Sequence, residues 1–489
     1  MIERIGERHA SACRYKNEVP EGSRRSARRT HFWPRDVLDS ATVLFPESLF
    51  DPFCPIIDHR RHSMATNSIR WLCATIVLSV HLQSAAADNW PEWRGNHGDG
   101  TSDEKGLPTK WTSTENVAWK VALPEPGNST PVVWDDRVYV TQPVVALNRR
   151  TLMCFHRRDG RLLWQAETEW KEADPTHATN PVCSSSPVTD GERVIAWFGS
   201  AGLFCYDMEG HELWKRDLGI QKHIWGYGSS PVIHGDLCYL NFGPGERSFL
   251  IAVNKKTGET VWQHDEPINT QGTSEAKFSG ADYYGSWSTP VLRRIGERDQ
   301  LIISFPFRVC GLDPLTGKEL WTSSGMNALV YTSPLIADDI VVAMGGYNGM
   351  SIGVQVKGDG DITESSRLWH HPKTKQRIGS GVIHDGYLFI HTDPGIAECF
   401  ELKTGKTVWE ERLSGPGATA TNWSSVMIAD GHCYTMNQGG DCFVFRASPQ
   451  FELISTNTIG ESSNSSVAAS NGQLFLRTHQ HLWCIGKQQ

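Results

Sequence analysis

Apolar and polar positions alternate in short runs along most of the chain. A typical unit opens with a pair of small polar residues, usually followed by Pro and two apolar residues, as in NSTPVV, SSSPVT, GSSPVI, WSTPVL and YTSPLI. A turn rich in Asp, Asn and Gly follows, and then a second apolar run such as RVYV, LCYL, QLIISF or YLFI. Period-two alternation between such turns predicts antiparallel β-strands joined by tight hairpins.

A tryptophan closes most units and returns at a spacing of roughly 40 to 60 residues, a period typical of β-propeller blades. The phrase before it often carries Asp-Gly or Thr-Gly, as in HRRDGRLLW, VNKKTGETVW and ELKTGKTVW. Four strands per unit make one blade, and a large aromatic side chain at a fixed place in each is expected to pack between blades. These structural tryptophans are Trp119, Trp164, Trp214, Trp262, Trp321, Trp369 and Trp409.

The number of openings predicts an all-β fold, an eight-bladed propeller of four-stranded antiparallel blades. The eighth unit lacks its own last strand, but NVAWK at 116–120 matches one, so this N-terminal strand is expected to complete the last blade. The seventh unit has QFELI in place of the tryptophan phrase, which keeps seven blades as the alternative. The openings lie at Ser129, Ser185, Ser229, Ser288, Thr332, Gly379, Ser424 and Ser465.

The amino-terminal region divides from the repeats. Residues 1–63 are rich in Arg and His and have no period, so we expect an over-extended reading of the start or a disordered leader. Residues 64–87 have the order of a secretory signal peptide, with an apolar stretch too short to anchor the chain in a membrane. The expected parts are then a lead-in at 88–115 and the propeller at 116–486, in a protein exported to the periplasm or beyond the cell, with no transmembrane segment in its mature form.

Charge and cysteine content narrow the partners. A formal net charge of −8 argues against nucleic acid as a partner, because binding it needs a basic surface.

The chain has 12 Cys, none adjacent to another, and many recur at one position of successive units. Equivalent positions in neighbouring blades are too far apart for the Cα separation of about 5.5 Å that a disulfide needs. We therefore expect buried free thiols in a monomeric propeller.

The phrases AVNKKTGETVW, GLDPLTGKELW and CFELKTGKTVW resemble the tryptophan-docking repeat of pyrroloquinoline-quinone (PQQ) proteins. The resemblance covers about residues 90–486 and implies a bacterial PQQ-like β-propeller. The family includes quinoprotein alcohol dehydrogenases and BamB, the propeller lipoprotein of the outer-membrane assembly machine. Because the motif describes how blades pack, it is specific for the fold and says little about function.

The resemblance leaves two function classes open. Its dehydrogenases hold PQQ with Ca²⁺ and use a general-base Asp and a disulfide between adjacent Cys. This chain has no adjacent Cys, and the Ca²⁺ ligands cannot be matched residue by residue. We therefore favour a binding or assembly scaffold for a protein, peptide or glycan, and assign no catalytic residue, metal or cofactor. The alternative is a PQQ- and Ca²⁺-dependent alcohol or sugar dehydrogenase.

A candidate binding site follows from the topology. Connections between blades, and those between the second and third strands, lie on one rim of a propeller, and here they are the longest. Long loops on a rigid scaffold often carry function, although residues beside a channel also serve to fill it. His391 and Asp393 are the best acid–base candidates there, but a turn explains Asp393 equally well. The candidates at the channel mouth are His223, Trp225, Tyr227, Tyr284, Trp287, Tyr331, His391, Asp393, Asn422 and Trp423.

Overall fold

The computed structural model describes residues 89–488, apart from 173, 246, 267–283, 348 and 376. The predicted leader at 1–63 and signal peptide at 64–87 lie outside the described residues. By its contacts the chain divides into Met1–His81 and Leu82–Gln489, and the fold below is that of the second unit. None of the helices in the described ranges is long and apolar enough to cross a membrane.

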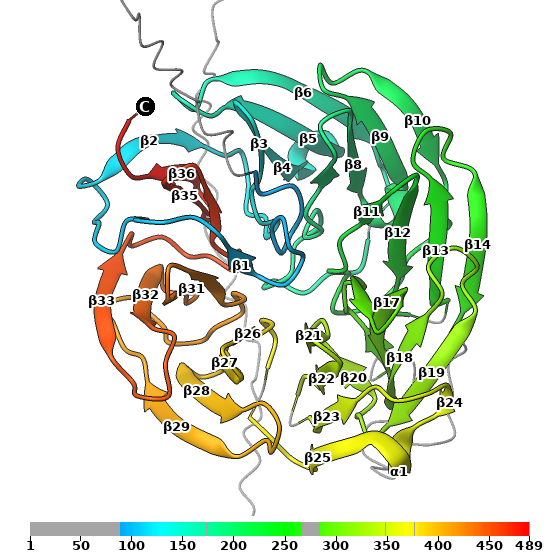
Figure 1. Ribbon diagram of the computed structural model, residues 1–489. Coiled ribbons are helices and arrows are strands. Elements are labelled where there is room, and N and C mark those ends of the chain that lie inside the picture. Colours follow the sequence, from blue (N-terminus) through cyan, green and yellow to red (C-terminus); the bar gives the residue numbers. More distant parts are fainter. Residues whose placement is uncertain are drawn as a thin grey trace, which may run out of the picture. The chain divides into compact units, whose positions relative to one another are not determined.

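Eight antiparallel sheets follow one another around a central axis (Figure 1). Blade 1 has β3 (Val132–Trp134), β4 (Arg137–Val144), β5 (Arg149–His156) and β6 (Leu162–Glu169), with η1 (Val145–Leu147) after β4. Blade 2 has β7 (Val188–Thr189), β8 (Arg193–Trp197), β9 (Leu203–Asp207) and β10 (Glu212–Arg216), with η2 (Gly199–Ala201) after β8. Blade 3 has β11 (Val232–His234), β12 (Leu237–Phe242), β13 (Phe249–Asn254) and β14 (Thr260–Asp265). Blade 4 has β16 (Val291–Ile295), β17 (Arg298–Phe305), β18 (Arg308–Leu312) and β19 (Glu319–Ser324).

The second half of the ring repeats the plan. Blade 5 has β21 (Leu335–Ala337), β22 (Ile340–Met344), β23 (Ser351–Gln355) and β25 (Arg367–His371). Blade 6 has β26 (Val382–His384), β27 (Tyr387–Thr392), β28 (Ile396–Glu401) and β29 (Thr407–Arg412). Blade 7 has β30 (Met427–Ala429), β31 (His432–Met436), β32 (Asp441–Arg446) and β33 (Leu453–Thr458). Blade 8 has β34 (Ala468–Ser470), β35 (Gln473–Arg477) and β36 (His481–Ile485), and its outer strand is β2 (Val117–Ala122).

The N-terminal strand closes the ring, as the sequence predicts. β2 pairs antiparallel with β36, and Trp119 lies opposite Cys484. The eight-bladed prediction is confirmed, and the seven-bladed alternative is wrong, because the degenerate seventh unit still forms a complete blade. Pairing β2 with β36 in one sheet removes two unpaired strand edges.

Neighbouring blades pack through the predicted tryptophans. The indole N–H of Trp119 donates to the carbonyl oxygen of Arg157 in blade 1, at 2.6 Å. Trp164, Trp214, Trp262, Trp369 and Trp409 make the same bond to the next blade, at 2.8–3.1 Å. A glycine of that blade often lies on the indole face: a Cβ on Gly160 would be 2.6 Å from Trp119. Apolar clusters of adjacent blades fill the space between sheets, so the core is distributed around the ring.

Trp321 departs from this pattern. Its indole N–H donates to the side-chain oxygen of Gln300 in its own blade, at 2.7 Å, and its ring is fully buried. The following blade lacks the usual tight turn before its outer strand. Instead, β24 (Gly360–Asp361) pairs parallel with β19, and α1 (Thr363–Ser366) leads into β25. The seam between blades 4 and 5 is therefore closed by an added strand.

The small polar pairs that open the units form a continuous ring around the channel. In each blade the hydroxyl of the second residue accepts a hydrogen bond from the backbone N–H of its counterpart in the preceding blade, at 2.8–3.2 Å. The ring has eight links and closes on itself, which explains why Ser or Thr recurs at this place. The accepting hydroxyls belong to Ser186, Ser230, Thr289, Ser333, Ser380, Ser425, Ser466 and Thr130.

Ser230→Ala is expected to lower the free energy of unfolding by about 1–3 kcal/mol, because the buried N–H of Ser186 loses its acceptor. The matched control is Ser229→Ala: the Ser229 hydroxyl is also buried but has no hydrogen-bond partner among the described residues. That variant should be neutral or slightly stabilising. Urea unfolding of the three proteins checks this, and equal losses in both variants would contradict a structural role for the ring.

The lead-in runs across the centre of the ring near the turns between first and second strands. Trp90 bridges to Val133 of blade 1, and β1 (Thr101–Ser102) pairs parallel with β30 of blade 7 (Figure 1). Between them, the buried guanidinium of Arg94 donates to the carbonyl oxygens of Val426 and Gly381, at 2.8 and 2.6 Å. Residues 89–102 thus form a plug in the centre of the ring. The expectation of a lead-in at 88–115 did not include this position inside the ring.

The cysteines behave as the repeat predicts. The nine described cysteines are all free and buried. Burial raises the pKa of the Cys154, Cys205 and Cys399 thiols to about 12, so they stay protonated and unreactive. Recurrence at one strand position therefore reflects packing between blades.

Candidate functional site

A cavity of about 1240 Å³ occupies the mouth of the channel on the loop-rich rim. Its wall comes from residues that precede or belong to the opening pairs of most blades, and its floor includes Trp93 of the plug. Six further aromatic residues and five side-chain amides dominate the rest of the lining. The aromatic residues are Trp225, Trp287, Phe307, Tyr331, Tyr347 and Trp423, and the amides belong to Asn128, Asn180, Asn327, Gln438 and Asn464.

The aromatic side chains are held by contacts with one another and with the connections between blades. The Trp287 ring meets that of Tyr331 edge-on, with centroids 5.0 Å apart, and its N–H donates to the carbonyl oxygen of Gly226 at 3.0 Å. The ring of Trp225 lies 4.6 Å from that of His177. Asn180 donates to the backbone oxygens of Trp225 and Tyr227, at 2.7 and 3.1 Å. These contacts present apolar faces with polar rims to the cavity.

The candidate residues divide into two groups of five. Trp225, Trp287, Tyr331, Asp393 and Trp423 line the cavity. His223, Tyr227, Tyr284, His391 and Asn422 are buried and lie outside its lining.

The buried group contacts the backbone and rings that shape the cavity. The Tyr227 hydroxyl accepts a hydrogen bond from the Cys183 N–H at 3.0 Å, and the Asn422 amide donates to the His391 and Ser424 carbonyl oxygens at 2.9 and 3.0 Å. The His223 ring lies edge-on to Trp287, with centroids 4.9 Å apart, and Tyr284 packs against Phe307 at 5.7 Å.

The two acid–base candidates lie in different environments. Burial lowers the pKa of His391 to about 3, so its ring stays neutral, and one ring nitrogen lies 3.2 Å from the Thr435 hydroxyl. Asp393 lines the cavity, and burial raises the pKa of its carboxyl above the usual range. The two residues come from the same strand end, but only Asp393 lines the cavity, and His391 is buried behind it.

Sequence reasoning missed several lining residues. Trp93 is brought here by the plug, and Phe307 and Met326 come from blade 4 and the connection that follows it. Tyr347 belongs to GGYNGM, one of the unusual rim connections, and its side chain is 53% exposed. Only that connection gave a usable signal, because the others depend on contacts between residues distant in sequence.

The lining fits PQQ and Ca²⁺ poorly. PQQ is a tricarboxylate, and Ca²⁺ takes six to eight oxygen ligands, usually with several carboxylates. The cavity offers the carboxyl of Asp393 and the ammonium of Lys373. In the described ranges no group of three or more His, Cys, Asp or Glu side chains is placed to hold a metal ion. The donor set therefore matches a ligand bound by aromatic faces and amides.

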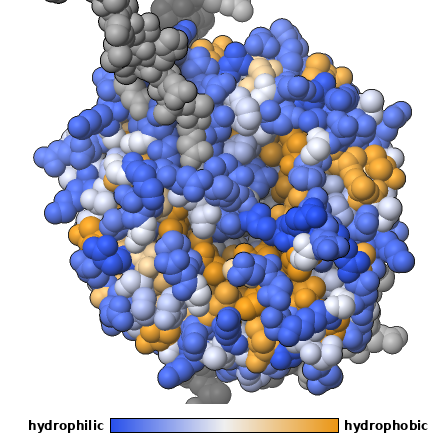
Figure 2. All heavy atoms as spheres, in the orientation of Figure 1, coloured by the Kyte–Doolittle hydropathy of each residue, from blue (hydrophilic) through white to orange (hydrophobic). Residues whose placement is uncertain are grey.

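Hydrophobic residues at the surface of the ring gather near its centre. On the face shown in Figure 2, hydrophilic residues cover most of the surface, and hydrophobic residues are visible around the hollow in the middle of the ring. On the rim, Ile220 and Ile224 of the connection between blades 2 and 3 are each 43% exposed. Exposed aliphatic residues beside an aromatic cavity are typical of interaction surfaces.

Known proteins resemble this chain over most of the ring. A family model described as outer membrane protein assembly factor BamB matches residues 101–218 and 148–411. BamB from Kangiella koreensis is 23% identical over 175 residues, which cover 34% of this chain. The chain spans only 38% of that relative's length.

Solved structures share the fold. BamB from Moraxella catarrhalis has a TM-score of 0.53 and 14% identity, with 76% of this chain and 97% of that chain covered. The quinohemoprotein alcohol dehydrogenase from Comamonas testosteroni has a TM-score of 0.58 and 12% identity, with 82% and 81% covered. At these identities the likeness shows the fold alone, whereas the family model spans more than half of the sequence. The chain therefore belongs to the PQQ-like β-propeller family of the outer membrane protein assembly factor BamB.

Proposed function

We propose that the protein is a non-catalytic scaffold whose channel-mouth cavity binds an extended segment of a protein partner. The observation that carries this proposal is the lining: seven aromatic residues and five side-chain amides, with one carboxyl and one ammonium group. Aromatic faces supply contact area at low entropic cost, and amides pair with the backbone of an extended peptide. A cavity of about 1240 Å³ has room for several residues of such a segment.

A peptide is favoured over a glycan by the surroundings of the cavity. Ile220 and Ile224 are exposed on the same rim, and Tyr347 extends from the connection between β22 and β23. Aliphatic and aromatic residues together suit the mixed side chains of a peptide, whereas a sugar gains mainly from the aromatic faces. The family's description as an assembly factor also supports a protein partner.

The second candidate is a PQQ-dependent alcohol or sugar dehydrogenase. It is favoured by the fold shared with the quinohemoprotein alcohol dehydrogenase. The scarcity of charged groups in the cavity counts against it, since both the quinone's carboxylates and Ca²⁺ need charged partners.

Export completes the proposal. A protein that works with partners of the cell envelope must leave the cytoplasm, and the signal-like segment at 64–87 supplies the means. We infer a periplasmic or extracellular, monomeric propeller. Cell fractionation with an epitope at the C-terminus tests the location directly.

Selection of peptides from a random display library against the purified protein tests the binding proposal. We expect enriched peptides that quench the fluorescence of the cavity tryptophans. The same protein is titrated with neutral oligosaccharides, and with PQQ plus Ca²⁺ followed by assay of alcohols and aldoses with an artificial electron acceptor. Stoichiometric PQQ binding with turnover would replace the scaffold proposal by the dehydrogenase, and binding of oligosaccharides alone would replace the peptide by a glycan.

A further inference from the structure

A second cavity of about 670 Å³ lies between the plug and the first strands of blades 2, 3 and 4. It shares no lining residue with the channel-mouth cavity. Two adjacent residues of the plug line different cavities. Glu92 lines the smaller cavity, and Trp93 lines the larger cavity at the channel mouth. The smaller cavity has the volume of a typical small-molecule site. Neither peptide binding nor dehydrogenase activity at the channel mouth depends on it.

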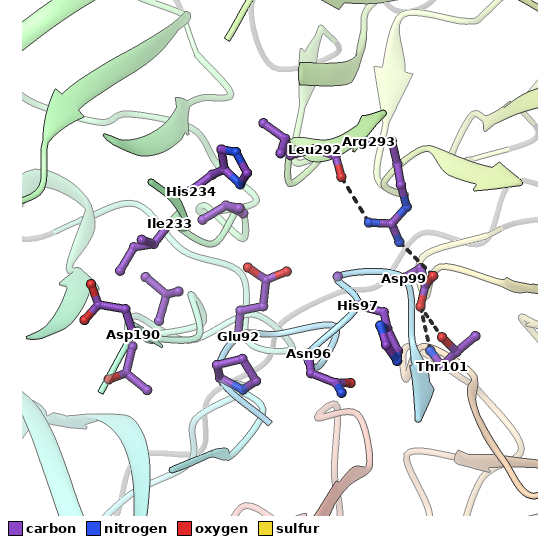
Figure 3. Close-up of a pocket in the computed structure, with 15 residues that line it drawn as sticks. Glu92, Asn96, His97, Asp99, Thr101, Asp190, Ile233, His234, Leu292 and Arg293 are labelled. Carbon is purple, nitrogen blue, oxygen red and sulfur yellow. Dashed lines mark hydrogen bonds and ion pairs between the residues drawn. The ribbon is translucent and has the colours of Figure 1, made fainter. Parts of the chain in front are cut away.

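The Glu92 carboxyl group points into the open middle of this cavity (Figure 3). Among the described residues, no hydrogen bond to this carboxyl group is recorded. The charged groups that act on it are the guanidinium group of Arg293 and the carboxylate of Asp99. The plug folds closely around it, since a Cβ on Gly98, which has φ +65°, would lie 2.6 Å from one carboxyl oxygen. The group is therefore fixed in place and still accessible to a ligand.

Other charged groups around the cavity already have partners. Arg293 pairs with Asp99 at 2.7 Å, and Asp190 pairs with Lys255 at 2.7 Å. His97 lies 2.9 Å from Asp103, and His234 faces the cavity from β11. Among the described lining residues, the one guanidinium group, that of Arg293, is therefore already neutralised by Asp99. Of the three acidic side chains that the structure describes in the lining, Asp99 and Asp190 have an ion pair, and none is recorded for Glu92.

One part of the wall is apolar. Val188, Val232, Ile233 and Leu292 line it beside the carboxyl group. A metal ion does not fit, since no cluster of three ligating side chains occurs in the described part of the chain and the volume far exceeds that of an ion. A carboxyl group facing methyl and methylene groups suits a ligand with one positive end and a short hydrocarbon body.

We propose that this cavity binds a small organic cation, with a primary ammonium or guanidinium group against the Glu92 carboxylate and an alkyl chain along the apolar wall. Burial raises the pKa of Glu92 to about 8, with Asp99 adding to the rise and Arg293 opposing it. A bound ammonium group favours the ionised carboxylate, so binding near neutral pH releases a proton. Affinity for the cation therefore increases as the pH rises towards about 8.

Calorimetric titration of the full-length protein with 1-aminopentane tests the proposal. Glu92→Gln keeps the shape of the side chain and removes its charge, and Glu115→Gln is the matched control on an exposed part of the lead-in. We expect binding to the wild type and to Glu115→Gln, weakened about tenfold or more in Glu92→Gln. The heat should depend on the buffer's ionisation enthalpy, as proton release requires. Equal binding to all three proteins, equal binding of 1-pentanol, or no binding of the amine would overturn the proposal.

A second readout separates loss of binding from loss of folding. The stability that protonated Glu92 contributes is complete below its ordinary pKa of 4.5 and is lost as the pH rises through about 8. Glu92→Gln should therefore match the wild type in melting temperature in acid and exceed it by a few degrees at about pH 9. A lower melting temperature at both pH values would show that the carboxylate is a structural group, against its assignment as a ligand-binding group.

Discussion

Trp119→Ala is expected to lower the free energy of unfolding by about 3–5 kcal/mol, the largest stability effect among the variants considered. Trp119 is 8% exposed and belongs to β2, the strand that joins the two ends of the ring. Its indole N–H donates a hydrogen bond to the carbonyl oxygen of Arg157 in blade 1, and Gly160 of that blade lies against the indole ring. Removing the indole leaves a cavity at the one seam where the closing strand is not continuous in sequence with the rest of its blade.

Two further variants separate the contribution of the Trp119 hydrogen bond from that of its apolar packing and provide a control on the same strand. Trp119→Phe keeps most of the apolar area and loses the hydrogen bond to Arg157, so about 1–2 kcal/mol of the loss should remain. Lys120→Ala, on the exposed side of the same strand, should cost about 1 kcal/mol or less, because the cation lies 4.7 Å over the Trp483 ring. Urea denaturation followed by circular dichroism measures all three. A loss below about 1 kcal/mol for Trp119→Ala would mean that β2 does not seal the ring.

Trp423→Ala is expected to weaken binding of a selected peptide by about 10- to 100-fold, which corresponds to the removal of a buried aromatic anchor from an interface. Trp423 lines the cavity next to the opening pair of blade 7 and is only partly buried. Stability should change little, because the side chain faces the cavity and is not packed between blades. Fluorescence anisotropy with a labelled peptide measures the affinity.

The control for this variant is Trp170→Ala. Trp170 is also partly buried and follows β6 at the end of blade 1, but it does not line the cavity. Its replacement should leave peptide affinity within about twofold of the wild type. If both variants lose affinity equally, the effect is general and the cavity is not the binding surface.

The fold was predictable because its signals are local and repeated. The period-two strands, the Asp–Gly turns and the tryptophan phrases each report on neighbours within one blade or the next. The opening pair was recognised from its recurrence, but its role as a closed ring of hydrogen bonds appears only when all eight blades are in place. The exception at Trp321 follows from β24, whose two residues carry no strand pattern of their own.

The candidate site was predictable in position and only half predictable in detail. Residues before an opening pair lie at the channel mouth by topology, so Trp287, Tyr331 and Trp423 were found. Whether such a side chain turns into the cavity or behind its wall depends on packing with distant loops, which separates Trp225 from Tyr227. The plug, with Glu92 and Trp93, was expected only as part of a lead-in. Its position inside the ring gave no signal, because its partners are spread over five blades.

Hydrogen–deuterium exchange of the full-length protein, with and without a selected peptide, tests the binding account most directly. The account predicts slower exchange in the connections that carry Trp225, Trp287, Tyr331 and Trp423, and unchanged exchange in the turns on the opposite face. Protection confined to the outer strands of the blades, or to the turns that face away from the rim, would contradict it.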